Sequence, residues 1–222
     1  MDEKFILDYN ETIGFRGITI SFPYLEERFN YVSEHRIKDV CVIQDTEEKR
    51  VVDFSFLRGF EFIETFHWLV DLSKKSNVNG IYFLSKLKNM RWIDSFFRLD
   101  FSQLSAIEIL NLPYQKNLHF EYLPNLRELY LNSVKAENLS FLPNLEKLET
   151  LRLLWGQFAS LHGLEQCKNL KKLNIGNCYK LSDANTTLQK LKHLECVVIT
   201  SCKKHDVDVS ELMSRVNHVY IE

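Results

Sequence analysis

The chain has 222 residues, of which 45% are hydrophobic and 26% are charged, with a formal net charge of −2. That is enough apolar material for one sizeable core. The near-neutral charge argues against a general nucleic-acid binder, which needs a basic surface to displace counterions.

The sequence favours a cytoplasmic setting. Its first residues, MDEKFILDYNETIG, carry acids and lack the apolar segment of a secretory signal. No apolar run approaches the roughly 20 residues that span a bilayer, so we expect no membrane association. The five cysteines are an odd number without a Cys-x-x-Cys pair, which fits a reduced compartment.

The N-terminal segment has the features of a cap. Residues 1–14 contain FILDY, a candidate extra strand. Residues 23–34, PYLEERFNYVSE, follow Ser21, begin with Pro23 and carry apolar residues at helical spacing. We therefore expect a helix here, and together these segments would protect the N-terminal end of a repeat array.

A repeated strand pattern follows the cap. The pattern Leu-x-x-Leu-x-Leu recurs every 22 residues at Leu126/Leu129/Leu131, Leu148/Leu151/Leu153 and Leu170/Leu173/Ile175. Extending it predicts seven more strands: Phe15-x-x-Ile18-x-Ile20, Ile37-x-x-Val40-x-Val42, Ile63-x-x-Phe66-x-Trp68, Leu87-x-x-Met90-x-Trp92, Leu104-x-x-Ile107-x-Ile109, Leu194-x-x-Val197-x-Ile199 and Val216-x-x-Val219-x-Ile221. The 17-residue unit between Met90 and Ile107 is short, and we expect a tight, irregular turn there.

A fixed period in the twenties with this internal spacing resembles the leucine-rich repeat family, in its 22-residue class. The resemblance implies an α/β leucine-rich repeat solenoid, or horseshoe. About ten short strands would form a curved parallel sheet on its concave face, with mostly short 3-10 or extended arms on the convex side. Residues 1–222 would form a single domain, with the N-terminal cap and first repeat in 1–36 and the remaining repeats in 37–222. We expect a monomer whose C-terminal edge strand could pair with another chain.

The cysteines have structural explanations. Cys178 and Cys202 fall at the ninth repeat position, where a small polar residue turns the chain and bonds neighbouring backbone. The arrangement His193-x-x-Cys196-x5-Cys202-x-x-His205 resembles a zinc site. Its two cysteines would lie at opposite ends of a strand, roughly 20 Å apart, and zinc ligands must converge within about 2.3 Å of the ion. We expect no metal site. Cys41 differs, because the pattern points it to the concave side.

No catalytic motif is present: the sequence has no Gly-rich phosphate loop, His-Glu-x-x-His or Gly-x-Ser-x-Gly. The one candidate for an acid–base catalytic site is a group of three residues on the predicted concave surface: His67, Arg91 and Glu108. A solvated binding surface is the favoured interpretation of that grouping. We therefore predict a protein without catalytic activity or cofactor.

The outward residues of the strands suggest where function lies. The middle outward row reads Thr19, Cys41, His67, Arg91, Glu108, Tyr130, Arg152, Asn174, Val198 and Tyr220. A second row consists of the residues two positions after each member of the middle row. It contains five large aliphatic residues, Ile43, Leu69, Ile93, Leu110 and Leu154, and Trp155 follows Leu154 at the same end of the strands. An apolar stripe edged by Arg, Tyr and Trp has the composition of an interface centre. The alternative is that loops fold over the aliphatic row, or that it belongs to a buried seam.

These observations predict a non-enzymatic protein–protein interaction module that binds its partner on the concave face, as leucine-rich repeat proteins mostly do. Eleven residues are the candidate binding set: Ile43, His67, Leu69, Arg91, Ile93, Glu108, Leu110, Tyr130, Arg152, Leu154 and Trp155. One alternative is an immunity or inhibitor protein that neutralises a toxin or an enzyme by occlusion. Another is a substrate-recognition subunit of a ubiquitin ligase. The stretch 167–183, CKNLKKLNIGNCYKLSD, resembles the cysteine-containing repeats of F-box proteins, but one repeat alone shows it and no F-box precedes the array.

Overall fold

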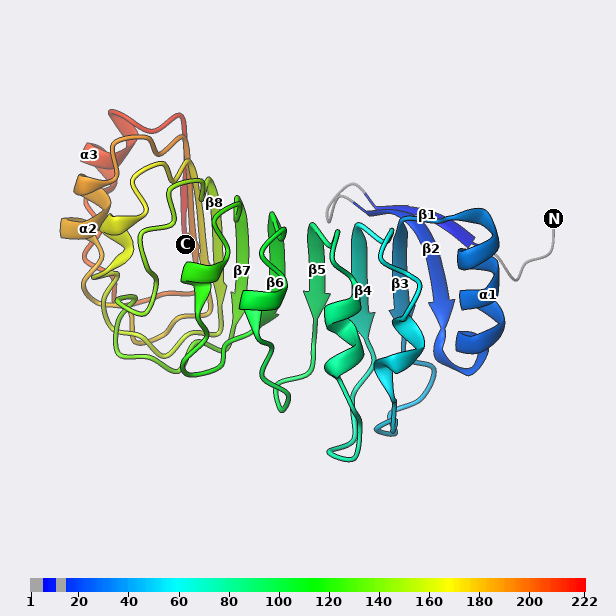
Figure 1. The fold of residues 1–222 in the computed structure, drawn as a ribbon. Helices are drawn as coiled ribbons and strands as arrows, with labels where there is room; N and C mark the ends of the chain where they lie inside the picture. The colour runs from blue at the N-terminus through cyan, green and yellow to red at the C-terminus, as the bar shows by residue number, and fades with distance from the viewer. Residues whose placement is uncertain (1–5, 11–14) are drawn as a thin grey trace. The chain divides into compact units, whose positions relative to one another are not determined.

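The computed structural model describes residues 6–10 and 15–222. The chain divides into two compact units, Met1–Ile107 and Glu108–Glu222. Figure 1 shows the strands of each unit side by side in chain order. Their assembly into one domain over residues 1–222 stays a prediction.

The first unit is built on strands β1 (Ile6–Asn10), β2 (Phe15–Ser21), β3 (Asp39–Ile43), β4 (Thr65–Leu69) and β5 (Asn89–Trp92). The segment FILDY was predicted to add a strand, and β1 confirms it, pairing antiparallel with β2. Phe5 itself lies outside the described residues. The pairs from β2 to β5 are parallel.

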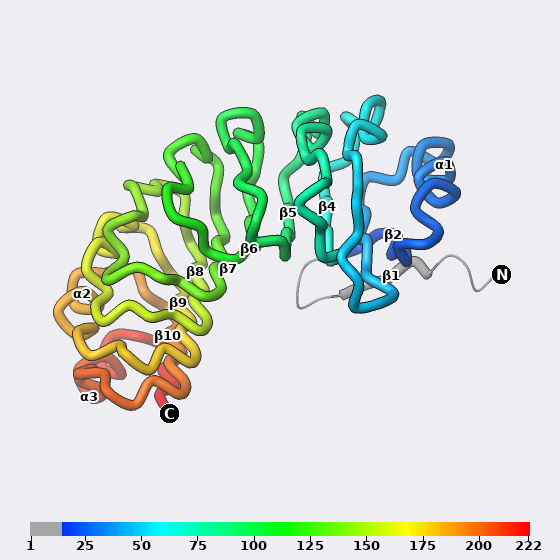
Figure 2. Tube along the Cα trace, turned by 90° about the horizontal axis from the view of Figure 1, so that it is seen from below, coloured from blue at the N-terminus to red at the C-terminus, as the bar shows by residue number. Residues whose placement is uncertain are grey.

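The second unit contains β6 (Ile109–Pro113), β7 (Glu128–Asn132), β8 (Thr150–Leu154), β9 (Lys172–Gly176), β10 (Cys196–Thr200) and β11 (His218–Ile221). Each pairs in parallel with its neighbours in sequence. Parallel neighbours require a return arm between them, and Figure 2 shows these arms gathered on one side of the strands in each unit. This arrangement is the repeating architecture of a leucine-rich repeat solenoid.

The predicted N-terminal helix is present as α1, Leu25–His35, preceded by the 3-10 turn Phe22–Tyr24 that contains Pro23. Its apolar face is buried, and the Phe29 ring centroid lies 4.9 Å from that of Phe56 and 5.2 Å from that of Phe60. The helix ends at His35, and the following residue, Arg36, adopts the left-handed conformation with φ 51°.

Most return arms are short 3-10 or irregular segments, as predicted. The 3-10 turns are Phe54–Leu57, Asn79–Phe83, Phe101–Gln103, Phe120–Tyr122 and Leu164–Gln166. Two short helices, α2 (Asn185–Lys190) and α3 (Val209–Met213), were not predicted. The start of α2 is stabilised by a residue distant in sequence, which a local pattern does not reveal. Asp206 Oδ1 accepts hydrogen bonds from the backbone N–H groups of Ala184 and Asn185 at 2.7 and 3.0 Å.

The core changes in character along the chain. In the first unit it is aromatic: the Phe54 ring lies 4.6 Å from Trp68 and 5.7 Å from Trp92, centroid to centroid. In the second unit leucines dominate, and β7 and β8 each alternate between buried and partly exposed residues. Such alternation is what a pleated strand with one covered face requires.

One predicted strand is wrong in register. The sequence pattern placed Ile107 and Ile109 inward, but β6 pairs Leu110 with Leu129 and Leu112 with Leu131. The strand is therefore shifted by three residues. Leu110 points into the core and is 0% exposed, so its predicted place on the open surface is wrong. The 17-residue unit disappears, since Met90 and Leu110 are 20 residues apart.

The repeat cysteines act as backbone acceptors. Gly156 N–H donates to Cys178 Sγ at 3.2 Å, and Cys178 N–H donates to Cys202 Sγ at 3.3 Å. Both side chains are buried, and all five cysteines are free thiols. The sequence predicted this structural role for Cys178 and Cys202.

Candidate functional site

In each unit the strand residues that point away from the return arms form what we call the open face, the surface predicted to be concave. In the first unit the register aligns Thr19, Cys41, His67 and Arg91 across β2 to β5. In the second it aligns Asn111, Tyr130, Arg152, Asn174, Val198 and Tyr220 across β6 to β11. Glu108 is absent from this middle row, because the shifted register of β6 puts Asn111 there.

The aliphatic row of the first unit does lie on the open face. Ile43 is aligned with Leu69, and both are partly exposed. Ile93 continues the row after β5 and is 38% exposed. Phe96 lies three residues further on, 55% exposed, with the Lys74 ammonium 5.0 Å from its ring centroid. Apolar surface at the strand ends of this unit is therefore open to solvent.

His67 does not lie on a solvated surface. It is 1% exposed, its Nε2 lies 3.1 Å from Asn89 Oδ1, and the Phe15 ring lies 5.3 Å away. The cause is β2, which extends back to Phe15 and directs that side chain onto the open face, where the sequence had assigned it to the core. Burial lowers the pKa of His67, and the Arg91 charge acts in the same direction. Both effects disfavour the protonated imidazole.

The burial of His67 removes this residue from the exposed surface on which the sequence placed a candidate catalytic group with Arg91 and Glu108. Cys41 is beside His67 in the register and is only 6% exposed, so the thiol and the imidazole are both covered. Glu108 lies outside the middle row, immediately before β6. In the part of the chain that the structure describes, no three His, Cys, Asp or Glu side chains are placed to hold a metal ion.

Three polar side chains of β7 and β8 are in contact on the open face of the second unit. The Tyr130 hydroxyl donates to a carboxylate oxygen of Glu128. The Arg152 guanidinium carbon lies 4.6 Å from the Tyr130 ring centroid, which is within the range of a cation–π contact. Burial, followed by the bond to Glu128, raises the pKa of Tyr130 above its ordinary value of 10.0. Arg152 is therefore positioned by a cation–π contact with Tyr130.

Trp155 stands at the end of β8 in a strained conformation. Four residues that directly follow strands of this unit, Ser133, Trp155, Asn177 and Ser201, have φ between 54° and 57°. The left-handed conformation lets each N–H bond the next strand, as Trp155 N–H does to Gly176 O at 2.9 Å. Ser and Asn suit this position, but a bulky aromatic residue in it is a genuine outlier. Trp155 is also 56% exposed, so burial does not compensate for the strain.

The strand-start edge of this unit behaves differently. Glu149 accepts from Arg127 and from Lys171, both at 3.0 Å. These bonds, that to Lys171 first, lower the pKa of Glu149. A pocket lies beside these ion pairs of Glu149. It is lined by Arg127, Glu146, Lys147, Glu149, Asn169, Lys171 and His193. Arg127 and Lys171 are both already bonded to Glu149, so these two cations are less available to a charged partner than Arg152, which has no ion pair among the described residues.

Three residues of the second unit extend the predicted set. Lys172 is exposed and aligned with Thr150, which makes it a diagonal neighbour of Arg152 on the open face. Asn174 is aligned with Arg152 itself. Tyr179 is 59% exposed and its hydroxyl lies 3.3 Å from Asn177 Oδ1. The period-2 pattern already contained Lys172 and Asn174, whereas Tyr179 lies beyond the strand, where the pattern gives no direction.

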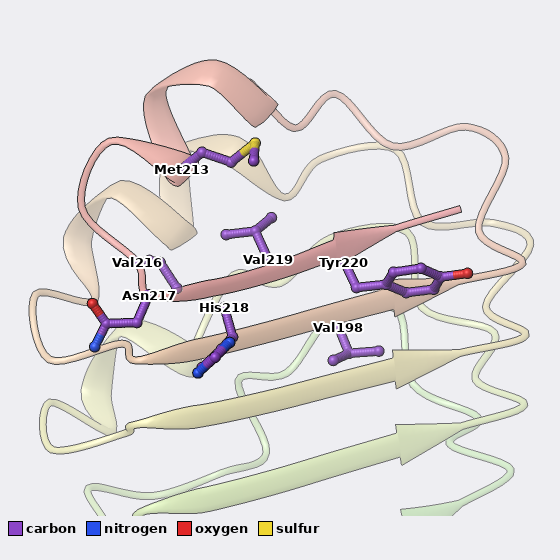
Figure 3. Close-up of a pocket in the computed structure, with 7 residues that line it drawn as sticks. All are labelled: Val198, Met213, Val216, Asn217, His218, Val219 and Tyr220. Atoms are coloured by element: carbon purple, nitrogen blue, oxygen red, sulfur yellow. The ribbon is translucent and has the colours of Figure 1, made fainter.

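A further pocket lies beside the last strand (Figure 3). Its lining comes from α3, β10, β11 and the turn before β11: Val198, Met213, Val216, Asn217, His218, Val219 and Tyr220. Met213 and Tyr220 are 62% and 56% exposed. The lining mixes apolar and polar side chains without an acid–base pair. Pairing of β11 with another chain stays a prediction.

Among known structures, the chain is similar to an internalin, InlF, from Listeria monocytogenes, with a TM-score of 0.53 and 16% identity. The match covers 82% of this chain and 54% of the internalin, so this chain spans about half of its length. The functional domain of InlJ from the same species, which includes a cysteine ladder, gives a TM-score of 0.44 at 12% identity, covering 76% of this chain and 45% of that one. A leucine-rich repeat protein of Leptospira interrogans gives 0.45 at 15%, covering 82% and 61%.

No protein-family model matches the chain, and the search of curated proteins gives no match. At this identity the likeness to the internalin concerns the fold. Together with the parallel strands and their short return arms, it defines a protein with the leucine-rich repeat solenoid fold. None of the helices within residues 6–10 and 15–222 has the length and apolar character needed to cross a bilayer.

Proposed function

We propose that this chain is a non-enzymatic module that binds another protein on the open face of its strands. The observation that carries the proposal is Trp155, whose backbone is left-handed and whose indole is exposed, directly after Leu154 and three residues after Arg152. Residues with a strained backbone cluster at functional sites, and Trp, Tyr and Arg are the residues that dominate binding energy at protein interfaces.

The surrounding residues support the same proposal. Tyr130 and Arg152 are already immobilised on each other, so binding would cost little side-chain entropy at these positions. Leu154 supplies partly exposed apolar surface next to them. In the first unit, Ile43, Leu69 and Ile93 offer a second apolar patch, and Arg91 is partly exposed beside it. His67 and Leu110 are too buried to contribute contacts, and Glu108 belongs to the strand-start edge.

The proposal is tested by affinity capture with two open-face variants, Arg152→Glu and Tyr130→Ala. Tyr122→Ala is the control, since Tyr122 is 48% exposed on a return arm of the same unit. Any captured protein is then purified and titrated against each variant, with circular dichroism confirming that the variants fold. We expect both open-face variants to lose binding and the control to retain it. Wild-type affinity in both Arg152→Glu and Tyr130→Ala would contradict the proposal.

The same titration separates the finer alternatives. A partner that is a toxin or an enzyme, and that loses activity when bound, would support the inhibitor function. Co-purification with other ubiquitin-ligase subunits would support substrate recognition. We further propose a monomer acting in the cytoplasm, a compartment in which five free thiols would stay reduced.

A further inference from the structure

The open face of the second unit carries two basic side chains, Arg152 and Lys172, and two acidic ones, Glu128 and Glu222, but no ion pair of the described part of the chain joins them. Each carboxylate instead accepts a tyrosine hydroxyl: Glu128 accepts from Tyr130, and Glu222 accepts from Tyr220 at 3.0 Å. Arg152 and Lys172 take part in none of the ion pairs found among the described residues. Two neighbouring cations on one face therefore form no ion pair with an acidic side chain of the described residues.

Arg152 also has an unsatisfied donor. Its Nε is buried and has no hydrogen-bond partner among the described residues. A buried donor without an acceptor is costly, and a guanidinium is suited to bind a carboxylate through two parallel bonds. An incoming carboxylate would satisfy this group. Asn174, aligned with Arg152 on β9, adds a neutral amide beside it.

The apolar part of the open face lies at a fixed distance from Arg152. Arg152 and Leu154 are alternate residues of β8 on the same face, and such positions are roughly 7 Å apart. Trp155 follows Leu154, and Trp155 and Tyr179 are 56% and 59% exposed. Arg152 and Leu154 therefore place a cationic and an apolar side chain side by side on one strand, and the exposed Trp155 directly follows that strand.

We propose that the second unit recognises a protein segment in which a carboxylate side chain lies roughly 7 Å from a large apolar side chain. The carboxylate binds Arg152 with support from Lys172, and the apolar side chain packs on Leu154 and Trp155. The inference rests on the proposed function, since it specifies the partner of that same surface. It predicts an acidic, partly apolar partner in place of a basic or purely apolar one.

The test uses a phage-displayed library of random dodecapeptides, selected on the immobilised full chain. Selected sequences are synthesised and titrated by fluorescence anisotropy against the wild type, Arg152→Gln and Trp155→Asn. Two matched controls report non-specific effects: Arg98→Gln removes an exposed arginine from the first unit, and Tyr122→Asn removes an exposed aromatic from a return arm. Peptides with Asp replaced by Asn, or Glu by Gln, are titrated in parallel.

We expect the selected peptides to be enriched in Asp or Glu close to a large apolar residue. Arg152→Gln and the amide peptides should each lose about tenfold or more in affinity, while both controls bind as the wild type does. Ligands that bind without an acid and tolerate Arg152→Gln, but not Trp155→Asn, would overturn the partner chemistry and leave the proposed function standing. Ligands indifferent to both open-face variants, or a library that yields no ligand, would overturn both.

Discussion

Gly176 leaves the space that the Leu154 side chain occupies. A Cβ placed on Gly176 would lie 2.8 Å from Leu154 Cδ2 and 3.3 Å from Thr200 Oγ1. Gly176 is aligned with Leu154 on the neighbouring strand, so the absence of a side chain on β9 sets where the leucine of β8 lies. The apolar part of the binding surface therefore depends on a residue that itself offers no side chain.

The substitution Gly176→Ala should move Leu154 with little effect on the fold. The clash is with the end of a flexible, partly exposed side chain, and Ala in a strand is favoured over Gly by roughly 0.5–1 kcal/mol. We expect the free energy of unfolding to change by less than about 1 kcal/mol, because the two effects oppose each other. Affinity for a partner or selected peptide should fall severalfold. Urea denaturation and the peptide titration measure the two quantities, and unchanged affinity would show that Leu154 is not in the contact.

Replacing Trp155 should stabilise the chain. Asn tolerates the left-handed conformation, and it is the residue found at the equivalent position 177, where φ is 56°. Since this conformation costs a non-Gly residue about 1–3 kcal/mol, we expect Trp155→Asn to raise the free energy of unfolding by up to about 1 kcal/mol while binding is lost. Chemical denaturation of the wild type and the variant shows whether the free energy of unfolding rises or falls.

The matched control is Asn177→Ala, which places a less tolerant residue in the same conformation and should destabilise the fold. A clear loss of stability in Trp155→Asn would mean that the indole serves the fold, and the functional reading of its strain would then fail.

The repeat architecture was predictable because the leucine pattern reports burial directly. Leu129, Leu131, Leu151 and Leu153 are all 0% exposed, as their spacing requires. The pattern also gave the direction of Tyr130, Arg152 and Leu154, since alternation on a strand fixes the face.

Other features depend on contacts that spacing does not contain. Residues 104–112 fit the pattern in two registers, and the expectation of a constant 22-residue unit selected the wrong one. The actual register buries both Leu110 and Leu112. His67 was misplaced because its cover, Phe15, comes from an extension of β2 that no repeat pattern predicts. The left-handed backbone at Trp155 follows from hydrogen bonding to the next strand and has no sequence signal of its own.

The register of β6 can be tested by stability measurements on two adjacent residues. Leu110 is fully buried, whereas Ile109 is partly exposed on the open face. Truncating a buried leucine costs about 2–5 kcal/mol, so Leu110→Ala should lower the free energy of unfolding by that amount and Ile109→Ala by markedly less. Urea denaturation of both variants decides the matter. The reverse order would restore the register that the sequence pattern favoured.

His67 should make stability depend on pH near neutrality. Burial lowers the pKa of the folded imidazole below its ordinary value of 6.5. As the pH falls below about 6.5, the unfolded chain binds a proton that the folded chain does not, so the free energy of unfolding falls. One proton limits this slope to about 1.4 kcal/mol per pH unit.

The measurement is the free energy of unfolding between about pH 5.5 and 7.5, a range that avoids most carboxylate titration. His67→Gln keeps an amide near Asn89 and removes the titrating group, so its slope should be shallower than that of the wild type. His193→Gln, at an exposed position, controls for the loss of a histidine as such. Equal slopes for the wild type and His67→Gln would mean that the imidazole takes up its proton in the folded state as readily as in the unfolded one. The burial under Phe15 would then have no energetic consequence, and His67 would return to the set of residues available to a partner.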